Sequence, residues 1–299
     1  MDYAKYIRTV SAGAFLLLPA FAGCGSSSPS EPATATGSQP ASTVAPTAIA
    51  AQGGSANSSA EKDSVVLNAS ALSLPFESAV RPADQPPANA GRPPDTTFTG
   101  LPVYKIMRRV QEDWPEIRFV DDSGKPLRWL VDLNTDLGAI QIEILPQLAP
   151  NHARNFLALV RAGYYRGMRF DRVRQEELVD AGGKESARLD QLEAGCPLGT
   201  GESGSGSLGY WLKHETSEQA HHVVGMVGAC RDEESDTGGA RFFILMSESP
   251  HLDGHQVIFG RVTRGLEVAR AIMIQAHGAG AGTEKPPVTI KGIEARQEK

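Results

Sequence analysis

The strictest alternation of apolar and polar residues lies at positions 139–145, where three isoleucines alternate with Gln141 and Glu143. Side chains two residues apart share one face of a strand, so this pattern is typical of a half-buried strand. An apolar run at 129–133 precedes it, and the turn-rich stretch 134–138 joins the two. The pattern therefore predicts a half-buried antiparallel hairpin.

Three further segments carry apolar residues at helical spacing. The first covers 101–114 and ends at Pro115, the second begins near Pro150 and ends at Gly163, and the third follows Gly265. Each pattern predicts an amphipathic helix, with glycine or proline at its ends. The apolar positions are Val103, Met107, Val110 and Trp114, then Ala153, Phe156, Leu157 and Val160, then Leu266, Ala269, Ile272 and Met273.

Short apolar runs at 117–120, 223–226, 242–246 and 257–262 predict further strands, and apolar residues at 288–293 mark a closing strand. Many short strands with few helices favour a mainly β fold over alternating βαβ units. We expect a closed antiparallel barrel plugged at its ends by two helices. The helix at 101–114 would then be an extra N-terminal element.

One arginine is the candidate working residue. Met168, Phe170 and Arg172 are two residues apart in a predicted strand, so we expect all three on one face. That arrangement would set a guanidinium beside apolar neighbours. An ordinary surface arginine on a strand is the alternative.

Residues 1–23 are predicted to be a secretory signal. Lys5 and Arg8 precede an apolar stretch at 10–22 that is too short to span a bilayer, and Phe-Ala-Gly then leads to Cys24. This ending resembles the lipobox of bacterial lipoproteins, in which the cysteine becomes the lipidated first residue. The resemblance implies a lipid anchor on Cys24 and a place in the bacterial cell envelope, on the periplasmic or extracytoplasmic face. An ordinary cleaved signal is the alternative.

Composition separates a tether from a folded part. Residues 24–99 are rich in Ser, Ala, Pro and Gly, and we expect them to be a disordered tether with a reach on the order of 50 Å. Residues 100–128 are expected to pack on the barrel as an extension. The folded domain itself is predicted to cover 129–296.

Charge and histidine spacing exclude other classes of function. A net charge of -6 without a long basic run argues against a nucleic-acid surface. Seven histidines show no metal-ligand spacing, since the adjacent His221 and His222 would point to opposite faces of a strand and only His214 lies near them. We expect no metal and no cofactor.

Motifs in order along residues 129–296 resemble the cyclophilin-type peptidyl-prolyl isomerases. The resemblance implies an eight-stranded antiparallel barrel capped by two helices, with a peptide groove on its outside. It also implies isomerase activity on proline-containing segments of exported proteins, and we expect a monomer. The motifs are Ala149-Pro150, Asn155-Phe156, Gly163-Tyr164-Tyr165-Arg166-Gly167, Phe170-Asp171-Arg172, Gly182-Gly183, Gly199-Thr200-Gly201, Phe242-Phe243-Ile244, Leu252-Asp253-Gly254 and Phe259-Gly260-Arg261-Val262.

The reaction requires no nucleophile or cofactor. Rotation about the peptidyl-proline bond faces a barrier of about 18–20 kcal/mol, and a cation placed where the twisted amide gains electron density would lower it. Arg172 fits that role because it is always charged and presents a rigid fork of donors. The resemblance further implies these substrate-binding residues: Leu178, Val179, Val227, Gly228, Arg241, Phe243, His251, Leu252 and Gln256.

The chain departs from the family pattern at several positions around the arginine. Asp171 and Gln256 stand where the family commonly has His, Leu178 where it has an aromatic residue, and Ala181 and Arg241 where it has Gln. Reduced activity is therefore expected. A catalytically weak peptide-binding or chaperone module is the second hypothesis.

Two smaller hypotheses concern cysteine and serine. The family fold places the loops that carry Cys196 and Cys230 side by side, so a disulfide is plausible in an oxidising compartment, against two free thiols. A hydrolase that uses Ser247 or Ser249 with His251 and Asp253 lacks a nucleophile-elbow or oxyanion motif, and we reject it.

Overall fold

The computed structural model describes residues 6–9, 74–81, 84–88, 90–180, 186–202, 207–232, 234, 236–277 and 287–298. All of them belong to one compact unit. The predicted signal peptide beyond residue 9, Cys24, and the tether up to residue 73 lie outside these residues.

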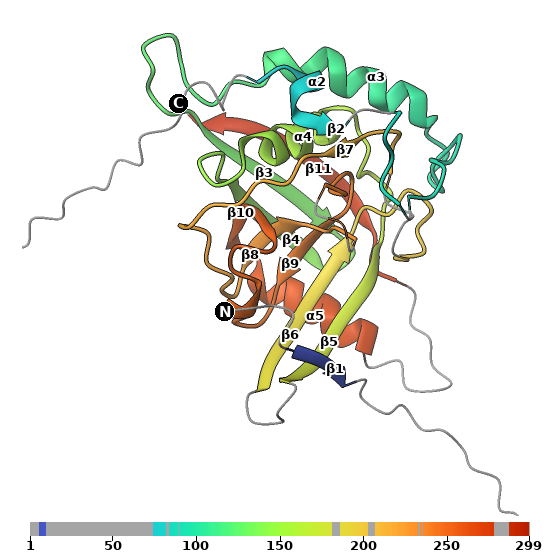
Figure 1. Cartoon of the computed structure of the whole chain (residues 1–299), viewed down its shortest axis with the longest axis vertical. Coiled ribbons are helices and arrows are strands. Elements are labelled where there is room, and N and C mark those ends of the chain that lie inside the picture. Colours follow the sequence, from blue (N-terminus) through green and yellow to red (C-terminus); the bar gives the residue numbers. More distant parts are fainter. Residues whose placement is uncertain are drawn as a thin grey trace, which may run out of the picture. The chain divides into compact units, whose positions relative to one another are not determined.

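A nine-stranded antiparallel sheet organises the unit (Figure 1). Its strands follow the order β1-β5-β6-β9-β8-β10-β4-β3-β11, and β2 (Val80–Arg81) and β7 (Trp211–Leu212) pair separately. The mainly β prediction is confirmed. The strands of the sheet are β1 (Tyr6–Thr9), β3 (Arg128–Thr135), β4 (Gly138–Ile144), β5 (Phe170–Asp180), β6 (Ser186–Ala194), β8 (Met226–Ala229), β9 (Phe242–Leu245), β10 (Val257–Arg264) and β11 (Ile290–Glu298).

Closure of the sheet into a barrel stays a prediction. β11 is the last strand of the sheet order, although backbone hydrogen bonds join the segment before β5 to the start of β11. The amide of Gly167 donates to the carbonyl of Ile290 at 2.8 Å, and the amide of Ile290 donates to Met168 at 2.8 Å. The hairpin predicted around residues 134–138 is present as β3 and β4.

Helices lie towards both ends of the sheet (Figure 1). α4 has Pro at its first turn, where a missing N–H costs nothing, and Gly163 follows it at φ +71°. Phe156 on α4 packs its ring 5.3 Å from Phe242 and 5.0 Å from Phe259, which anchors the helix in the core. The helices are α2 (Phe76–Ala79), α3 (Val103–Asp113), η2 (Trp114–Glu116), α4 (Pro150–Arg161), η3 (Pro250–Leu252) and α5 (Leu266–His277).

The N-terminal extension begins earlier than residue 100, which corrects the predicted tether boundary. Phe76 is 7% exposed, and its ring lies edge-on to Trp114 and Tyr210, each at 5.2 Å. The indole of Trp114 also donates to the carbonyl of Leu74 at 2.8 Å. The burial and the two ring contacts of Phe76 stabilise an ordered conformation of this segment in spite of the prolines around it. The expectation that α3 packs on the folded domain is confirmed, because Val103, Ile106 and Val110 are buried in its core.

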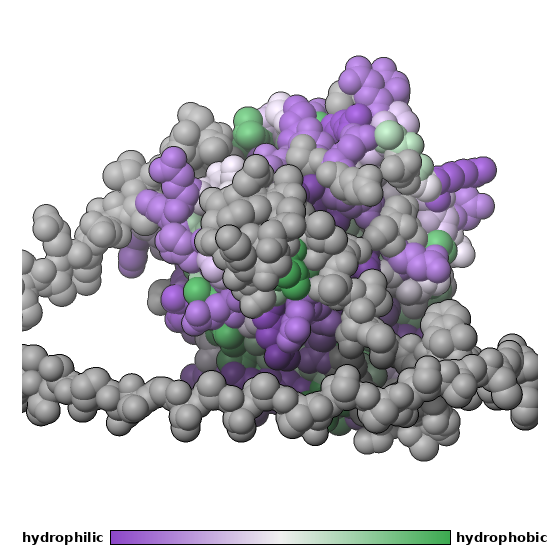
Figure 2. Space-filling view, turned by 60° about the horizontal axis from the view of Figure 1, so that its bottom comes forward, coloured by the Kyte–Doolittle hydropathy of each residue, from purple (hydrophilic) through white to green (hydrophobic). Residues whose placement is uncertain are grey.

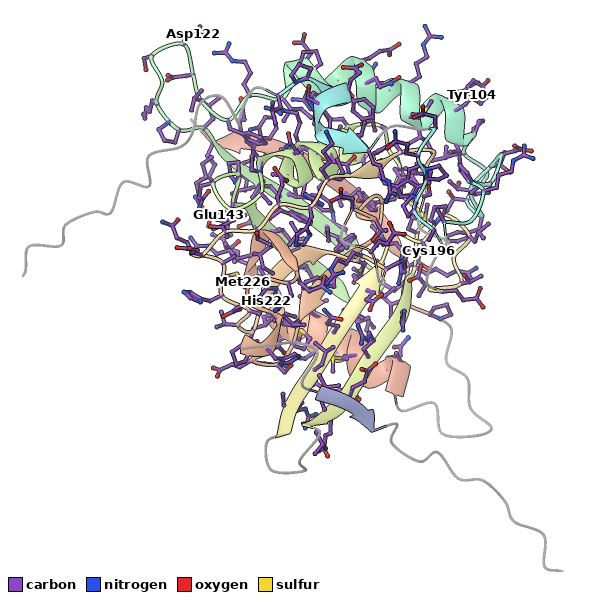
Figure 3. The ribbon with its side chains drawn as sticks, viewed as in Figure 1. Tyr104, Asp122, Glu143, Cys196, His222 and Met226 are labelled. Atoms are coloured by element: carbon purple, nitrogen blue, oxygen red, sulfur yellow. The ribbon has the colours of Figure 1, made fainter. Side chains whose placement is uncertain are left out.

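The exposed large hydrophobic side chains among the described residues are Tyr104, Leu137, Leu198, Val223 and Ile274. Figure 2 shows the described part of the surface as mainly hydrophilic with small separate hydrophobic areas. Tyr104 on α3, 63% exposed, points away from the sheet (Figure 3). Among the described residues, no helix combines the length and the apolar character needed to cross a membrane.

Candidate active site

A β-bulge at Asp171 determines where Arg172 points. Phe170 pairs with Ala194 of β6, but Arg172 pairs with the adjacent Glu193, so β5 has one extra residue. A bulge of this kind reverses the faces that follow it. Phe170 is therefore buried in the main core and Arg172 lies on the opposite, outer face. The prediction that these two residues share a face is wrong, because alternation along the chain does not reveal a bulge.

The outer face continues across three more strands. Glu193 lies opposite Phe243 of β9, and Phe243 lies opposite Gly228 of β8. A Cβ on Gly228 would come within 2.3 Å of the Phe243 ring, so only glycine allows this contact. Arg172 thus shares a face with Glu193 and an aromatic ring from a strand about 70 residues later in the chain.

The loop after β6 supports the guanidinium of Arg172. Nη1 of Arg172 donates to the carbonyl of Gly201 at 3.4 Å. Gly201 has φ +68°, and a Cβ there would lie 2.7 Å from the carbonyl oxygen of Asp171. Glycine is required at this point, since any side chain would push the loop away from the arginine strand.

Arg241 forms a buried ion pair with Glu193. The two side chains are only 6% and 4% exposed, and Arg241 also donates to the carbonyls of Gly201 at 3.2 Å and Glu202 at 3.4 Å. Burial opposes the charge of Arg241, but Cys230, Glu193 and Asp171 outweigh burial and raise its pKa above the ordinary value. The charge of Arg241 is therefore balanced within the protein.

Asp171 lies close enough to this pair for both charges to affect its pKa. Burial raises the pKa of Asp171 to about 6, although Arg241 and the hydrogen bond from the amide of Cys196 oppose the rise. That amide lies 3.2 Å from Oδ2, while Oδ1 has no hydrogen-bond partner within the described part of the chain. Asp171 is thus a half-buried residue whose carboxyl group has a raised pKa.

Three of the predicted pocket residues share one apolar cluster. Leu178, Phe243 and Leu252 are buried together on the outer side of the sheet, and each is at most 4% exposed. Val179 is half-buried. Whether any of them contacts substrate stays a prediction. The other buried members of the cluster are Leu148, Leu189, Ala220, Leu245 and Ile258.

His251 and Gln256 lie after β9. His251 is 1% exposed, and burial first, then His222, lowers its pKa; Arg174 on the outer face of β5 adds to this effect. Gln256 is half-buried, and its Oε1 has no hydrogen-bond partner in the described structure. Their roles in substrate binding stay predictions.

The predicted backbone contacts of Val227 and Gly228 with substrate stay a prediction, although both residues lie inside the sheet. β8 is an interior strand, and Gly228 pairs with Phe243 of β9 on one side and Ile258 of β10 on the other. Val227 is fully buried in the main core. β8 ends at Ala229, and the amide of the next residue, Cys230, donates to the carbonyl of Arg241 at 3.1 Å.

Glu193 and Gln191 belong to the candidate site and were not identified from the sequence, which singled out Cys230 only as a possible disulfide partner. The family resemblance implies that Ala181 lies near the arginine, but residues 181–185 lie outside the described part. Glu193 stands opposite Arg172. Gln191 accepts a hydrogen bond from Arg174 on the same face at 3.3 Å. A strand in residues 186–194 was the missing signal.

Cys196 and Cys230 do not form a disulfide in this structure, which agrees with the alternative of two thiols. Cys196, which follows β6 (Figure 3), has its sulfur 3.8 Å from Thr200 Oγ1. Burial raises the pKa of Cys230, and Glu193 raises it further. Each thiol thus has its own polar neighbour.

The serines and histidines of this region form hydrogen bonds with a structural role. The hydroxyls of Ser247 and Ser249 lie 3.0 Å apart, and Ser249 donates to the carbonyl of Arg188. Asp253 binds Nδ1 of His222 at 2.7 Å and Nδ1 of His221 at 3.3 Å. Asp253 therefore orients His221 and His222. A hydrolytic triad would instead need Asp253 to orient His251. No cluster suited to a metal ion occurs among the described residues.

Comparison with known proteins identifies the relatives of this chain. Residues 130–295 match the family model described as "Cyclophilin type peptidyl-prolyl cis-trans isomerase/CLD". Peptidyl-prolyl cis-trans isomerase B of Bacillus subtilis is 38% identical over 136 residues, which cover 45% of this chain and 83% of the relative. Peptidyl-prolyl cis-trans isomerase-like 3 of Gallus gallus is 36% identical over 137 residues, or 46% of this chain and 77% of the relative. A solved cyclophilin from Cryptosporidium parvum has a TM-score of 0.48 and 23% identity, covering 57% of this chain and 99% of that one.

Proposed function

The chain belongs to the cyclophilin-type peptidyl-prolyl cis-trans isomerases, and we propose that it acts as a lipid-anchored isomerase on exported proteins, with Arg172 as its catalytic residue. Relatives named as isomerases, of which the matches cover 77–83%, support the activity itself. The catalytic residue, the substrates and the membrane anchor belong to the proposal.

One observation carries the role of Arg172. The bulge at Asp171 turns this side chain out of the core, onto the face that also holds Phe243. The carbonyl of Gly201 then holds the guanidinium from the side of the loop. An arginine fixed beside an aromatic ring on an outer sheet face suits an extended peptide that presents a proline.

The chemistry follows from amide resonance. Twisting the peptidyl-proline bond removes the resonance, so electron density returns from the carbonyl oxygen to the nitrogen as a localised lone pair. A guanidinium that donates to this density stabilises the twisted state more than either planar state, which is what lowers a barrier. Arg172 can supply both the charge and the donors.

Arg172→Ala tests the assignment directly. Loss of one donor that acts on the transition state costs about 100- to 1000-fold in rate, so we expect isomerisation of a proline peptide close to the uncatalysed rate. A protease-coupled assay measures this rate, and circular dichroism checks the fold. Arg188→Ala, an exposed arginine on β6 paired with Asp190, is the control. An unchanged rate in folded Arg172→Ala would remove Arg172 from the mechanism.

A specific observation favours the second hypothesis, a weakly catalytic peptide-binding module. Phe243, His251 and Leu252 are each 1% exposed, so a proline ring would have to displace neighbouring side chains to reach them. Titration of a proline peptide followed by NMR distinguishes the two hypotheses. Saturable binding with exchange no faster than in free peptide would support the module.

The proposed anchor rests on sequence. Lys5 and Arg8 before an apolar stretch at 10–22, followed by Phe-Ala-Gly-Cys, support export and lipidation of Cys24. An isomerase on such a tether would meet exported chains in the bacterial envelope, on the periplasmic or extracytoplasmic face. Its proposed substrates are proline-containing segments of those chains.

A further inference from the structure

The N-terminal extension touches the loop that supports Arg172. Phe98 donates its backbone amide to the carbonyl of Pro197 at 2.9 Å. Its ring lies against Gly199, where a Cβ would come within 2.7 Å of the ring. Residues from outside the region matched to the family thus hold the loop 195–202 by one hydrogen bond and one close ring contact.

Phe98 is itself held firmly. The turn at 97–101 is closed by the amide of Thr97 donating to Leu101 at 2.8 Å and by the amide of Gly100 donating to Thr97 at 2.8 Å. α3 starts directly after this turn, at Val103. The guanidinium of Arg169, just before β5, lies over the Phe98 ring, 5.2 Å from its centre. The ring is therefore fixed on the extension and also contacts the strand that leads to Arg172.

The loop passes this support on to the guanidinium. Gly199 and Gly201 are two residues apart, and both have positive φ, at +66° and +68°. The carbonyl of Gly201 accepts from Arg172 at 3.4 Å and from Arg241 at 3.2 Å. A shift of the loop by a few tenths of an ångström at Gly199 would therefore move the acceptor of both arginines.

We infer that Phe98 is a positioning residue for Arg172, acting through the loop 195–202. This inference rests on the proposed catalytic role of Arg172. Misplacement of a catalytic group by about 1 Å can cost on the order of 100-fold in rate, and loss of the ring contact permits a smaller displacement. Phe98→Ala should lower kcat about tenfold with little change in KM, because the surface that binds peptide is retained.

The matched control is Phe76→Ala. This phenylalanine also belongs to the extension, but its ring contacts Trp114 and Tyr210 and no residue of the loop 195–202 among the described ring contacts. It should lower the unfolding temperature as much as Phe98→Ala or more, with kcat within about twofold of the parent. Phe98→Tyr should restore kcat, since it keeps the ring against Gly199.

A double-mutant cycle with Arg172→Ala decides whether the effect runs through the arginine. NMR exchange of a proline peptide at high enzyme concentration measures the residual rates. Phe98→Ala should cost nothing further when Arg172 is already alanine. An equal loss in both backgrounds, or an equal fall in kcat for Phe76→Ala, would overturn the inference.

The catalytic role of Arg172 and the positioning role of Phe98 can be tested separately. If Arg172→Ala keeps the parent rate, the catalytic assignment is lost and the role of Phe98 with it. If Arg172→Ala loses activity but Phe98→Ala does not, only the role of Phe98 is lost. The backbone amide signals of Gly199 and Gly201 in Phe98→Ala give a readout besides rate, and unchanged signals would also overturn the inference.

Discussion

Glu193 lies directly opposite Arg172 in the pairing of β5 with β6, but its carboxylate binds Arg241 instead. Arg172 is left with the Gly201 carbonyl as its side-chain hydrogen-bond acceptor among the described residues. Glu193, the acidic residue beside the proposed catalytic arginine, is thus ion-paired with Arg241 and does not neutralise Arg172. Glu193 holds Arg241 in place, and Arg241 donates to the same Gly201 carbonyl that accepts from Arg172.

The first prediction concerns this ion pair. Glu193→Gln leaves the buried guanidinium of Arg241 without its main counter-charge, which should cost about 3–5 kcal/mol of stability. The double variant Glu193→Gln/Arg241→Gln removes both charges and should be more stable than either single variant. Urea unfolding of all four proteins measures the coupling. Additive effects of the two substitutions would show that the pair contributes no coupling to stability.

The second prediction is a pH dependence from Asp171. Its pKa of about 6 in the folded protein lies above the ordinary value near 3.9, so the folded state binds its proton more tightly than the unfolded chain. Ionising Asp171 therefore costs stability as pH rises through 4 to 6, and this cost is fully present above pH 6. Asp171→Asn should stabilise the protein by about 1–3 kcal/mol at pH 8 and by almost nothing at pH 4. Unfolding curves at both pH values check this, and an equal gain at both would contradict it.

Local patterns predicted the elements whose packing is decided by near neighbours. α4, α5 and the β3–β4 hairpin follow from periodicity and from proline or glycine at their ends. α4 is nevertheless buried on all sides from Asn151 to Val160, which its one-sided apolar pattern does not reveal. The family motifs added the antiparallel arrangement of the strands. These parts were predictable because no distant residue changes their register.

The site was harder to predict, since its geometry depends on pairing between distant segments. Nothing in the local sequence distinguishes Asp171 as a bulge residue, yet the bulge decides the face of Arg172. The pairing of β5 with β6 likewise determines that Glu193 is its neighbour. Whether Gly228 has a free backbone depends on β9 and β10, which pair with it from both sides. These features can be predicted only when the pairing of all strands in the sheet is known.

The third prediction tests the proposed anchor. Cys24→Ser should move the protein from the membrane fraction to the soluble fraction, because a hydroxyl cannot take the thioether-linked lipid of a lipoprotein. Cell fractionation followed by immunoblotting measures the distribution. Cys230→Ser, a cysteine within the folded unit, is the control and should fractionate like the parent. Continued membrane association of Cys24→Ser would contradict lipidation at this residue.

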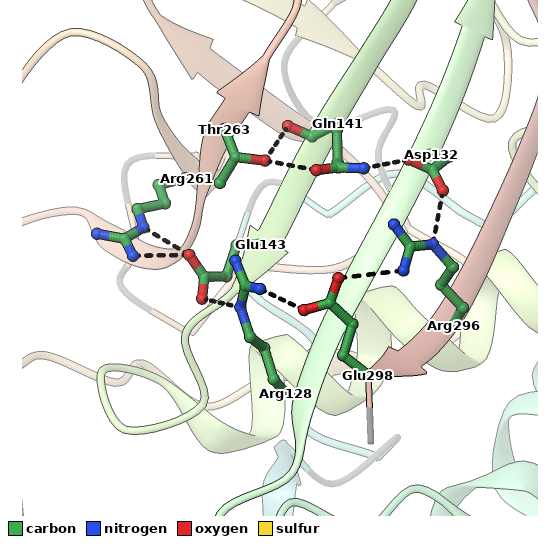
Figure 4. Close-up of polar contacts among 8 residues, drawn as sticks. All are labelled: Arg128, Asp132, Gln141, Glu143, Arg261, Thr263, Arg296 and Glu298. Atoms are coloured by element: carbon green, nitrogen blue, oxygen red, sulfur yellow. Dashed lines mark hydrogen bonds and ion pairs between the residues drawn. The ribbon is translucent and has the colours of Figure 1, made fainter.

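The last prediction concerns an ion-pair network on the exposed side of β3, β4, β10 and β11 (Figure 4). Glu143 accepts from Nε of Arg128 at 2.7 Å and from Nε of Arg261 at 2.8 Å, and Arg128 in turn pairs with Glu298. Burial tends to raise the pKa of Glu143, but the hydrogen bonds from the two arginines outweigh it and lower the pKa.

A lowered pKa in the folded state means that the ionised carboxylate stabilises the fold above the unfolded pKa, and this stabilisation is lost as pH falls through the folded pKa. Glu143→Gln should therefore cost about 1–2 kcal/mol at pH 7, since both arginines are half exposed and can turn to water. The loss should shrink below about pH 4 and in 1 M salt, where the Debye length falls to about 3 Å. Glu218→Gln, at an exposed glutamate, is the control and should change stability by less than about 0.5 kcal/mol. Urea unfolding at two pH values and two salt concentrations checks this, and a loss independent of both would show that Glu143 acts through its shape and not through its charge.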